Sequence, residues 1–240
     1  MSLDLRKVLA IARKDFGHYF VSPIGYVVLS VFFFVVGYFF YLIAVSPYPV
    51  ASMTPIFQNA VILLLFLTPM ITMKLWSEEE KSQTVELLRT SPVTLWEVVL
   101  GKYLAVCSFA VAMISSTFLY LLVILYAGNP DPGVLFANYL GFALVGMAFF
   151  SLGLLASTFS ENQIVAAVSA YGILLMLWII GAASQSVQGP IGAIFQYLSL
   201  FDHIEDFMRG VIDVSHLVYF GSLIFIGLFL SVKLLEGKRT

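Results

Sequence analysis

The charged residues of this sequence gather in one short stretch. Of its 12 basic and 14 acidic residues, nine lie among the 30 positions of KLWSEEEKSQTVELLRTSPVTLWEVVLGKY, which runs from Lys74 to Tyr103. Charged surfaces of this kind steer and orient a binding partner. Local capping of helix ends accounts for some of these charges but not for a whole polar segment of this length. We therefore expect a docking surface here, and the alternative is a solvated loop.

A second group of titratable residues lies near the end of the chain, in FDHIEDFMRGVIDVSHLVYF. Its members are Asp202, His203, Glu205, Asp206, Arg209 and Asp213. A metal site built from the first four is one interpretation, since these side chains are common ligands. However, neighbours in sequence point to different sides of a helix. Glu205 and Arg209 also have the i,i+4 spacing of a helical ion pair, so we favour a short amphipathic helix.

Other kinds of chemistry find little support in the sequence. It contains no G-x-x-x-x-G-K-[ST] stretch, so it has no P-loop, and any ATP-driven work needs a second polypeptide. The single cysteine, Cys107, excludes an intrachain disulfide and a metal–thiolate cluster. No basic stripe suggests a nucleic-acid partner, and no catalytic constellation is evident. We expect no enzyme activity and no cofactor or metal on this chain.

The elements that position these residues are membrane spans. A mean hydropathy of +0.98 and a hydrophobic content of 60% are too high for a soluble domain. We therefore expect most of the protein surface to face the lipid bilayer. Long apolar segments without strand-like alternation indicate an all-α membrane protein. We predict six transmembrane helices in a single domain over residues 1–240, at 24–45, 56–73, 103–127, 134–159, 164–183 and 217–235.

The basic residues predict the orientation of these spans. Eleven of the 12 fall before the first span, between the second and third, or at the end of the chain, and only Arg209 falls on the other side. By the positive-inside rule, both termini and the region 76–100 are cytoplasmic, and residues 184–216 form an outer loop with short helices. The spans hold almost no ionisable residue, which disfavours an ion-coupled carrier, and no filter-like loop supports a channel.

Two segments outside the spans have helical patterns. Residues 1–22 carry an apolar stripe opposite Arg6, Lys7, Arg13 and Lys14, which predicts an amphipathic helix in the cytoplasmic interface. Between the second and third spans, Ser77 with Glu80 and Thr94 with Glu97 both have the spacing of a capping box. We expect a short helix that begins at Ser77, then a break, and then a helix that continues into the third span.

Several stretches together resemble the ABC-2 type permeases, especially the gliding-motility (GldF) branch. They are SPIGYVVLSVFFF, MKLWSEEEKSQTVELLRTSPVTLWEVVLGKYLA, FSENQIVA and FDHIEDFMRGVIDVSHLVYF, and the likeness covers nearly the entire chain. The resemblance implies a six-helix half-transporter that pairs with a second permease, a copy or a paralogue, and with separate ABC ATP-binding subunits that hold ATP and magnesium. It also implies that the cytoplasmic coupling helix lies between Glu78 and Arg89.

The expected coupling residues follow from this correspondence. They are Glu78, Glu79, Lys81, Ser82, Glu86 and Arg89 on a polar face, with Val85 and Leu88 on the apolar side. We expect a permease subunit of an ATP-driven transporter in the inner membrane of a bacterial cell, with an unidentified cargo. The alternative is a membrane anchor that passes ATPase motion to a periplasmic auxiliary partner, as in gliding motility, without moving cargo.

Overall fold

The computed structural model describes residues 4–45, 52–81, 93–184 and 189–238. Within these ranges every regular element is a helix, so the predicted all-α fold is confirmed. The helices are α1 (Leu5–Val21), α2 (Pro23–Ala44), α3 (Thr54–Thr72), α4 (Ser77–Lys81), α6 (Leu95–Ala127), α7 (Pro132–Ser157), α8 (Gln163–Ser184), α9 (Pro190–Leu198), α10 (Leu200–Met208) and α11 (Val214–Gly237).

Six helices in the described residues, α2, α3, α6, α7, α8 and α11, are long and apolar enough to cross a membrane. Their ends lie within about three residues of the predicted spans, with one exception. The third spanning helix, α6, begins at Leu95 rather than near residue 103. The reason is the capping box, which starts a helix at Thr94 that then runs without a break through the third span.

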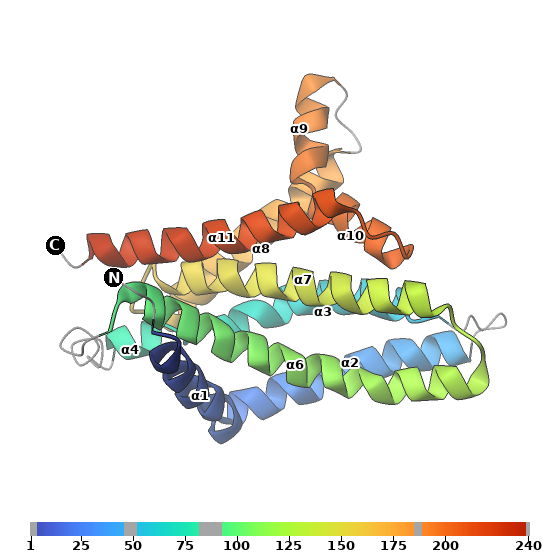
Figure 1. The fold of residues 1–240 in the computed structure, drawn as a ribbon, viewed down its shortest axis with the longest axis horizontal. Helices are drawn as coiled ribbons and strands as arrows, with labels where there is room; N and C mark the ends of the chain where they lie inside the picture. The colour runs from blue at the N-terminus through green and yellow to red at the C-terminus, as the bar shows by residue number, and fades with distance from the viewer. Residues whose placement is uncertain (1–3, 46–51, 82–92, 185–188, 239–240) are drawn as a thin grey trace.

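The six long helices lie side by side, and Figure 1 shows how their ends are sorted. One end of the bundle carries both ends of the chain, α4 and the start of α6, on the left in Figure 1. We call it the basic end. At the opposite end the chain passes from α6 to α7, and α10 lies beside the start of α11. Near that side α9 points away from the bundle, so the short helices between α8 and α11 are separate from the basic end.

Helix α7 is the centre of the fold, and it packs on α3, α6, α8, α10 and α11. Small residues make these contacts close. A Cβ atom at Gly153 would lie 2.4 Å from the hydroxyl oxygen of Thr72 on α3. A Cβ atom at Gly227 of α11 would lie 2.8 Å from the hydroxyl oxygen of Ser151 on α7. Most of α7 is therefore buried, whereas α2, α6, α8 and α11 leave most of their apolar surface exposed to the surroundings.

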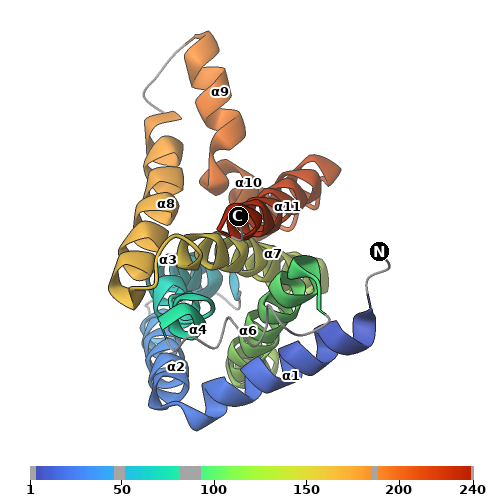
Figure 2. The ribbon, with the colours of Figure 1, turned by 90° about the vertical axis from the view of Figure 1, so that its left-hand side faces the viewer.

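Helix α1 lies across the bundle, as Figure 2 shows in a view along the length of the bundle. Val8 and Ala12 are buried where α1 packs on α6, and Gly101 permits the close approach, since a Cβ there would lie 2.7 Å from Ile11. Leu5 and Leu9, from the same predicted apolar stripe, stay exposed. The stripe therefore has two parts, one that holds α1 against the chain and one that points away from it.

Candidate functional site

The first charged cluster begins directly after the second spanning helix. Leu75 and Trp76 are buried between α3 and α4, so the entry into α4 is fixed by packing. The predicted capping box at this position is wrong. The Ser77 hydroxyl donates its hydrogen bond back to the carbonyl of Met73, and it is fully buried, because a serine here can satisfy the preceding helical turn instead of the next one.

The charged residues of α4 point in two directions. Glu78 and Lys81 are exposed, and Glu78 lies 3.9 Å from Lys74, one turn earlier. Glu79 and Glu80 instead contact distant parts of the same chain. The Glu80 carboxylate accepts a hydrogen bond from Lys238, just after α11, at 3.0 Å. One side of α4 is thus held by distant parts of the protein, and the other side carries the exposed Glu78 and Lys81.

Lys102 is the central cation of this region. It lies on α6, is 2% exposed, and its Nζ atom lies 2.8 Å from Glu79 Oε2 and 3.1 Å from Asp15 Oδ2. Lys14 approaches the same glutamate at 3.6 Å. A buried ammonium needs such compensation, because its desolvation costs several kcal/mol, roughly. We call Asp15, Glu79 and Lys102 the ion-pair junction, and it ties α1, α4 and α6 together.

Trp76 lies beside the junction. Its ring is 6.0 Å from the Lys102 ammonium, at the outer limit of a cation–π contact. The indole Nε1 is buried and has no hydrogen-bond partner among the described residues. The junction is therefore enclosed by an aromatic side chain rather than by water on this side, which strengthens its electrostatic interactions.

Glu97 makes a second link at the basic end. The predicted capping box at the start of α6 is confirmed: Thr94 accepts from the Glu97 amide, and the Glu97 carboxylate accepts from the Thr94 amide at 2.7 Å. The same carboxylate also accepts from the backbone amide of Asp4 at 2.9 Å, and Glu97 is 1% exposed. The starts of α1 and α6 are therefore fixed to each other.

The structure brings together only part of the predicted coupling residues. Glu78, Glu79 and Lys81 lie on α4, whereas the positions of Ser82, Val85, Glu86, Leu88 and Arg89 lie outside the described residues. Sequence reasoning missed the roles of Asp15 and Lys102. Asp15 has a detectable signal, because it follows Val8 and Ala12 at helical spacing and so places an acid on the buried face of α1.

The second predicted cluster forms a compact corner between α10 and α11. Glu205 and Arg209 pair as predicted. Ser199 caps α10, and its side chain accepts from the Asp202 amide at 3.2 Å. Asp206 contacts His216 of α11 at 2.8 Å. No three His, Cys, Asp or Glu side chains in the described ranges lie so that they could hold a metal ion together.

His203 and Asp213 have structural partners in this corner. The His203 ring is buried, its Nδ1 lies 2.7 Å from the Ser199 carbonyl oxygen, and it stacks on Tyr219 at 3.8 Å. Burial lowers the pKa of His203. Asp213 caps α11, and the hydrogen bond from the Ser215 amide lowers the pKa of this carboxyl. These contacts fix the corner without forming a catalytic arrangement.

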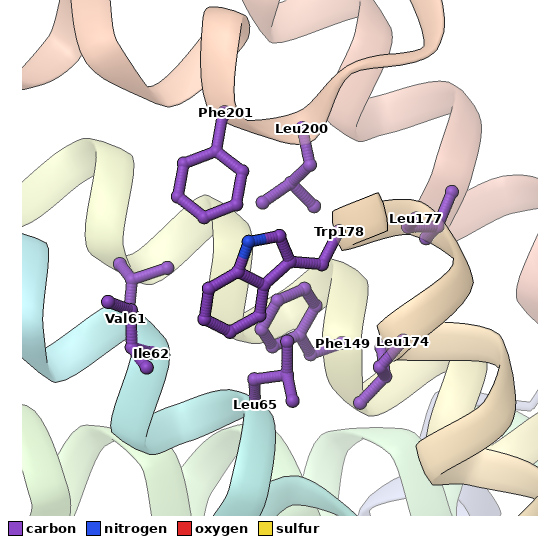
Figure 3. Close-up of a pocket in the computed structure, with 9 residues that line it drawn as sticks. All are labelled: Val61, Ile62, Leu65, Phe149, Leu174, Leu177, Trp178, Leu200 and Phe201. Carbon is purple, nitrogen blue, oxygen red and sulfur yellow. The ribbon is translucent and has the colours of Figure 1, made fainter. Parts of the chain in front are cut away.

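A small apolar pocket lies between α3, α7, α8 and α10. Figure 3 shows the Trp178 indole of α8 among the other lining side chains, with Phe149 and Leu65 near its six-membered ring and Phe201 above it. The lining is aliphatic and aromatic. Such a surface offers packing to another apolar group but has no side chain suited to acid–base or metal chemistry.

The described chain combines six helices long and apolar enough to span a membrane with a short charged helix at one end, and ion pairs tie this helix to α1, to α6 and to Lys238 after α11. No curated protein matches the sequence. Residues 9–217, most of the chain, match the family model described as "ABC-2 family transporter protein". The chain therefore belongs to the ABC-2 transporter family and is a membrane-embedded permease subunit of an ABC transporter, which works with an ATP-binding subunit.

Proposed function

We propose that α4 and the segment after it, as far as Arg89, receive the movement of the ATP-binding subunit, and that the ion-pair junction passes this movement to the spanning helices. The observation that carries the proposal is the contact of Glu79 with Lys102, which itself contacts Asp15. A displacement of α4 must move these partners with it or break buried ion pairs. The movement would reach α6 through Lys102 and α1 through Asp15.

The division of charges on α4 supports this proposal. Glu78 and Lys81 point outward and would meet the ATP-binding subunit, together with Ser82, Glu86 and Arg89, while Val85 and Leu88 would form the apolar side. Glu79 belongs to the same site with a different task, since its carboxylate is only 16% exposed and faces Lys102. Glu80 would extend the connection to the end of α11 through Lys238.

The proposed orientation places the basic end in the cytoplasm. The basic residues gathered there support it, and ATP and magnesium would be held by the partner on that side. α9, α10 and the corner with Asp202, His203, Asp206 and Asp213 would then lie outside a bacterial inner membrane. A second permease, identical or related, would complete the pathway, since the exposed apolar sides of the long helices are available for it as well as for lipid.

The nature of the cargo follows from what lines the spans. Their middle sections carry no Asp, Glu, Lys or Arg, which favours an amphiphilic or apolar cargo over an ion or a strongly charged solute. A reconstituted complex with its ATP-binding subunit would test this in liposomes. Stimulation of ATP hydrolysis by amphiphilic compounds, together with their movement across the membrane, is expected. Robust ATP hydrolysis that no compound stimulates, with transmission of force to a periplasmic partner, would instead favour the anchor role.

The coupling proposal is tested in the same preparation. In Glu79→Gln the permease and the ATP-binding subunit should still assemble, because the outward charges remain, but ATP hydrolysis should respond less to cargo. Glu236→Gln serves as the matched control, since it removes an exposed acid at the same end of the molecule without touching the junction or the proposed docking face. Equal responses in both variants would contradict a special role of the junction.

A further inference from the structure

We propose that α1 binds anionic phospholipid headgroups through Arg6 and Arg13. The first observation is an apolar row on this helix, formed by Leu5, Leu9, Phe16 and Phe20, whose first two members are exposed and whose last two are half-buried, with Phe20 also packed on Phe109. Their spacings of four, seven and four residues place them on one side of a helix. Leu5 is 71% exposed and Leu9 is 61% exposed. This row is distinct from Val8 and Ala12, which are buried against the chain.

The apolar row continues into the exposed surface of a helix long and apolar enough to span a membrane. Phe16 packs on Phe20 with ring centroids 5.0 Å apart, and Phe20 packs edge-on against Tyr26 at 6.4 Å. Tyr26 lies in the first turns of α2, a predicted membrane span, and is 56% exposed. Because the two surfaces meet, lipid that covers α2 also reaches the row on α1. Helix α1 crosses the bundle, as a helix that lies in the plane of the membrane surface would.

Arg6 and Arg13 lie beside this row. They are seven residues apart, so they share a side of the helix and are separated by about 10 Å along its axis. Both are exposed. The neighbouring residues Lys14 and Asp15 are used inside the chain, by Glu79 and Lys102. In contrast, no ion pair involves Arg6 or Arg13 among the residues that the structure describes.

The chemistry of this surface indicates which ligand it binds. A guanidinium group binds the oxygens of a phosphate with two parallel hydrogen bonds. An exposed arginine next to an apolar row at the membrane surface meets exactly such groups, at the depth where acyl chains give way to headgroups. A net negative headgroup is preferred to a zwitterionic one, because the latter carries its own cation. An acidic protein surface would satisfy the arginines but would leave the apolar row in water.

The test uses the purified full-length chain in a neutral detergent. Thermal unfolding is measured while a short-chain phosphatidylglycerol, or the matching phosphatidylcholine, is titrated in. A ligand of the folded state stabilises it by RT ln(1 + [L]/Kd), so the rise in unfolding temperature over each titration gives an apparent affinity. We expect phosphatidylglycerol to bind more tightly. In Arg6→Gln/Arg13→Gln this preference should fall by about 30-fold, roughly fivefold for each arginine near an anionic membrane surface.

The control variant is Lys74→Gln/Lys81→Gln, which removes the same charge from the same end of the molecule and should keep the preference. A second measurement places a fluorescent label on Leu9→Cys in a Cys107→Ser background. Nitroxide lipids should quench it in vesicles. The proposal is overturned if the arginine variant keeps the full preference, if the lysine variant loses as much, if inorganic phosphate stabilises the chain as well as the lipid does, or if an aqueous quencher alone reaches the label.

Discussion

At the scale of single residues, Lys102 is the side chain on which the basic end most depends. In Lys102→Met the carboxylates of Asp15 and Glu79 would face the vacated space without their cation. The free energy of unfolding should fall by about 3 kcal/mol, which is typical when one partner of a buried pair is removed. Denaturant unfolding in detergent measures this. Lys233→Met should change it by less than about 1 kcal/mol, since the pair of Lys233 with Glu236 is exposed.

The triple variant Asp15→Asn/Glu79→Gln/Lys102→Met separates charge from packing. It neutralises all three members of the ion-pair junction while keeping their approximate shapes. Most of the lost stability should return, because the unpaired charges are gone. A triple variant as unstable as Lys102→Met would mean that the lysine stem, rather than its charge, holds the three helices together.

His203 should make stability depend on pH at the opposite end. Its pKa lies below its ordinary value of 6.5 because the ring is buried, so the unfolded chain binds a proton more readily than the folded one. The stability that this residue contributes is therefore present above pH 6.5 and is lost as the pH falls below it. In thermal unfolding at pH 7.5 and pH 5, the wild type should lose more stability than His203→Phe. An equal loss would show that His203 is not the source of the pH dependence.

At the scale of elements, α4 should behave as two surfaces. The outward double reversal Glu78→Lys/Lys81→Glu should leave the stability of the permease unchanged but reduce recovery of the ATP-binding subunit in a pull-down by severalfold, although single exposed charges contribute only about 0 to 1 kcal/mol. Leu88→Asp should be more severe, since it would place a charge at an apolar contact. Normal recovery and normal cargo response in both variants would identify this region as a solvated loop.

The sequence predicted elements well where their signals are local. Thr94 and Glu97 lie three residues apart, and their capping box is seen as expected. Ser77 and Glu80 have the same spacing, yet Ser77 bonds backward and Glu80 pairs with Lys238. The partner of Ser77 is only four residues away, but that of Glu80 is 158 residues away, and no local pattern reveals it. For the same reason the junction between Asp15 and Lys102 could be located only in the folded chain, although an acid on the buried face of α1 indicated that a partner must exist.

At the scale of the whole molecule, the orientation in the membrane is open to a direct measurement. In a Cys107-free background, single cysteines at Ser82 and at Ser215 should be labelled from opposite sides, Ser82 only after the inner side is made accessible. The basic residues at one end of the bundle are the physical reason. Labelling of Ser82 from outside in intact cells would reverse the proposed orientation, and with it the side on which the ATP-binding subunit docks.

The number and type of the spans were predictable because hydrocarbon imposes a simple rule, that every backbone group must be satisfied within a helix. How the helices pack was not. The central position of α7 depends on contacts such as Gly153 with Thr72 and Gly141 with Phe207, which join segments far apart in the sequence. Small residues in a span are typical of close helix packing, but the fold decides which residues they contact.

The order of residues in the ion-pair junction has a consequence for biosynthesis. Asp15 and Glu79 are both synthesised before Lys102, so at a few residues per second or more the two carboxylates are already at the membrane surface when the lysine leaves the ribosome. The Lys102 ammonium is thus synthesised after both of the carboxylates that compensate its burial. Glu80 has the opposite fate, because its partner Lys238 is synthesised 158 residues later. The chain can complete its first ion pairs during insertion, and it can close the link between α4 and the end of α11 only after α11 has been made.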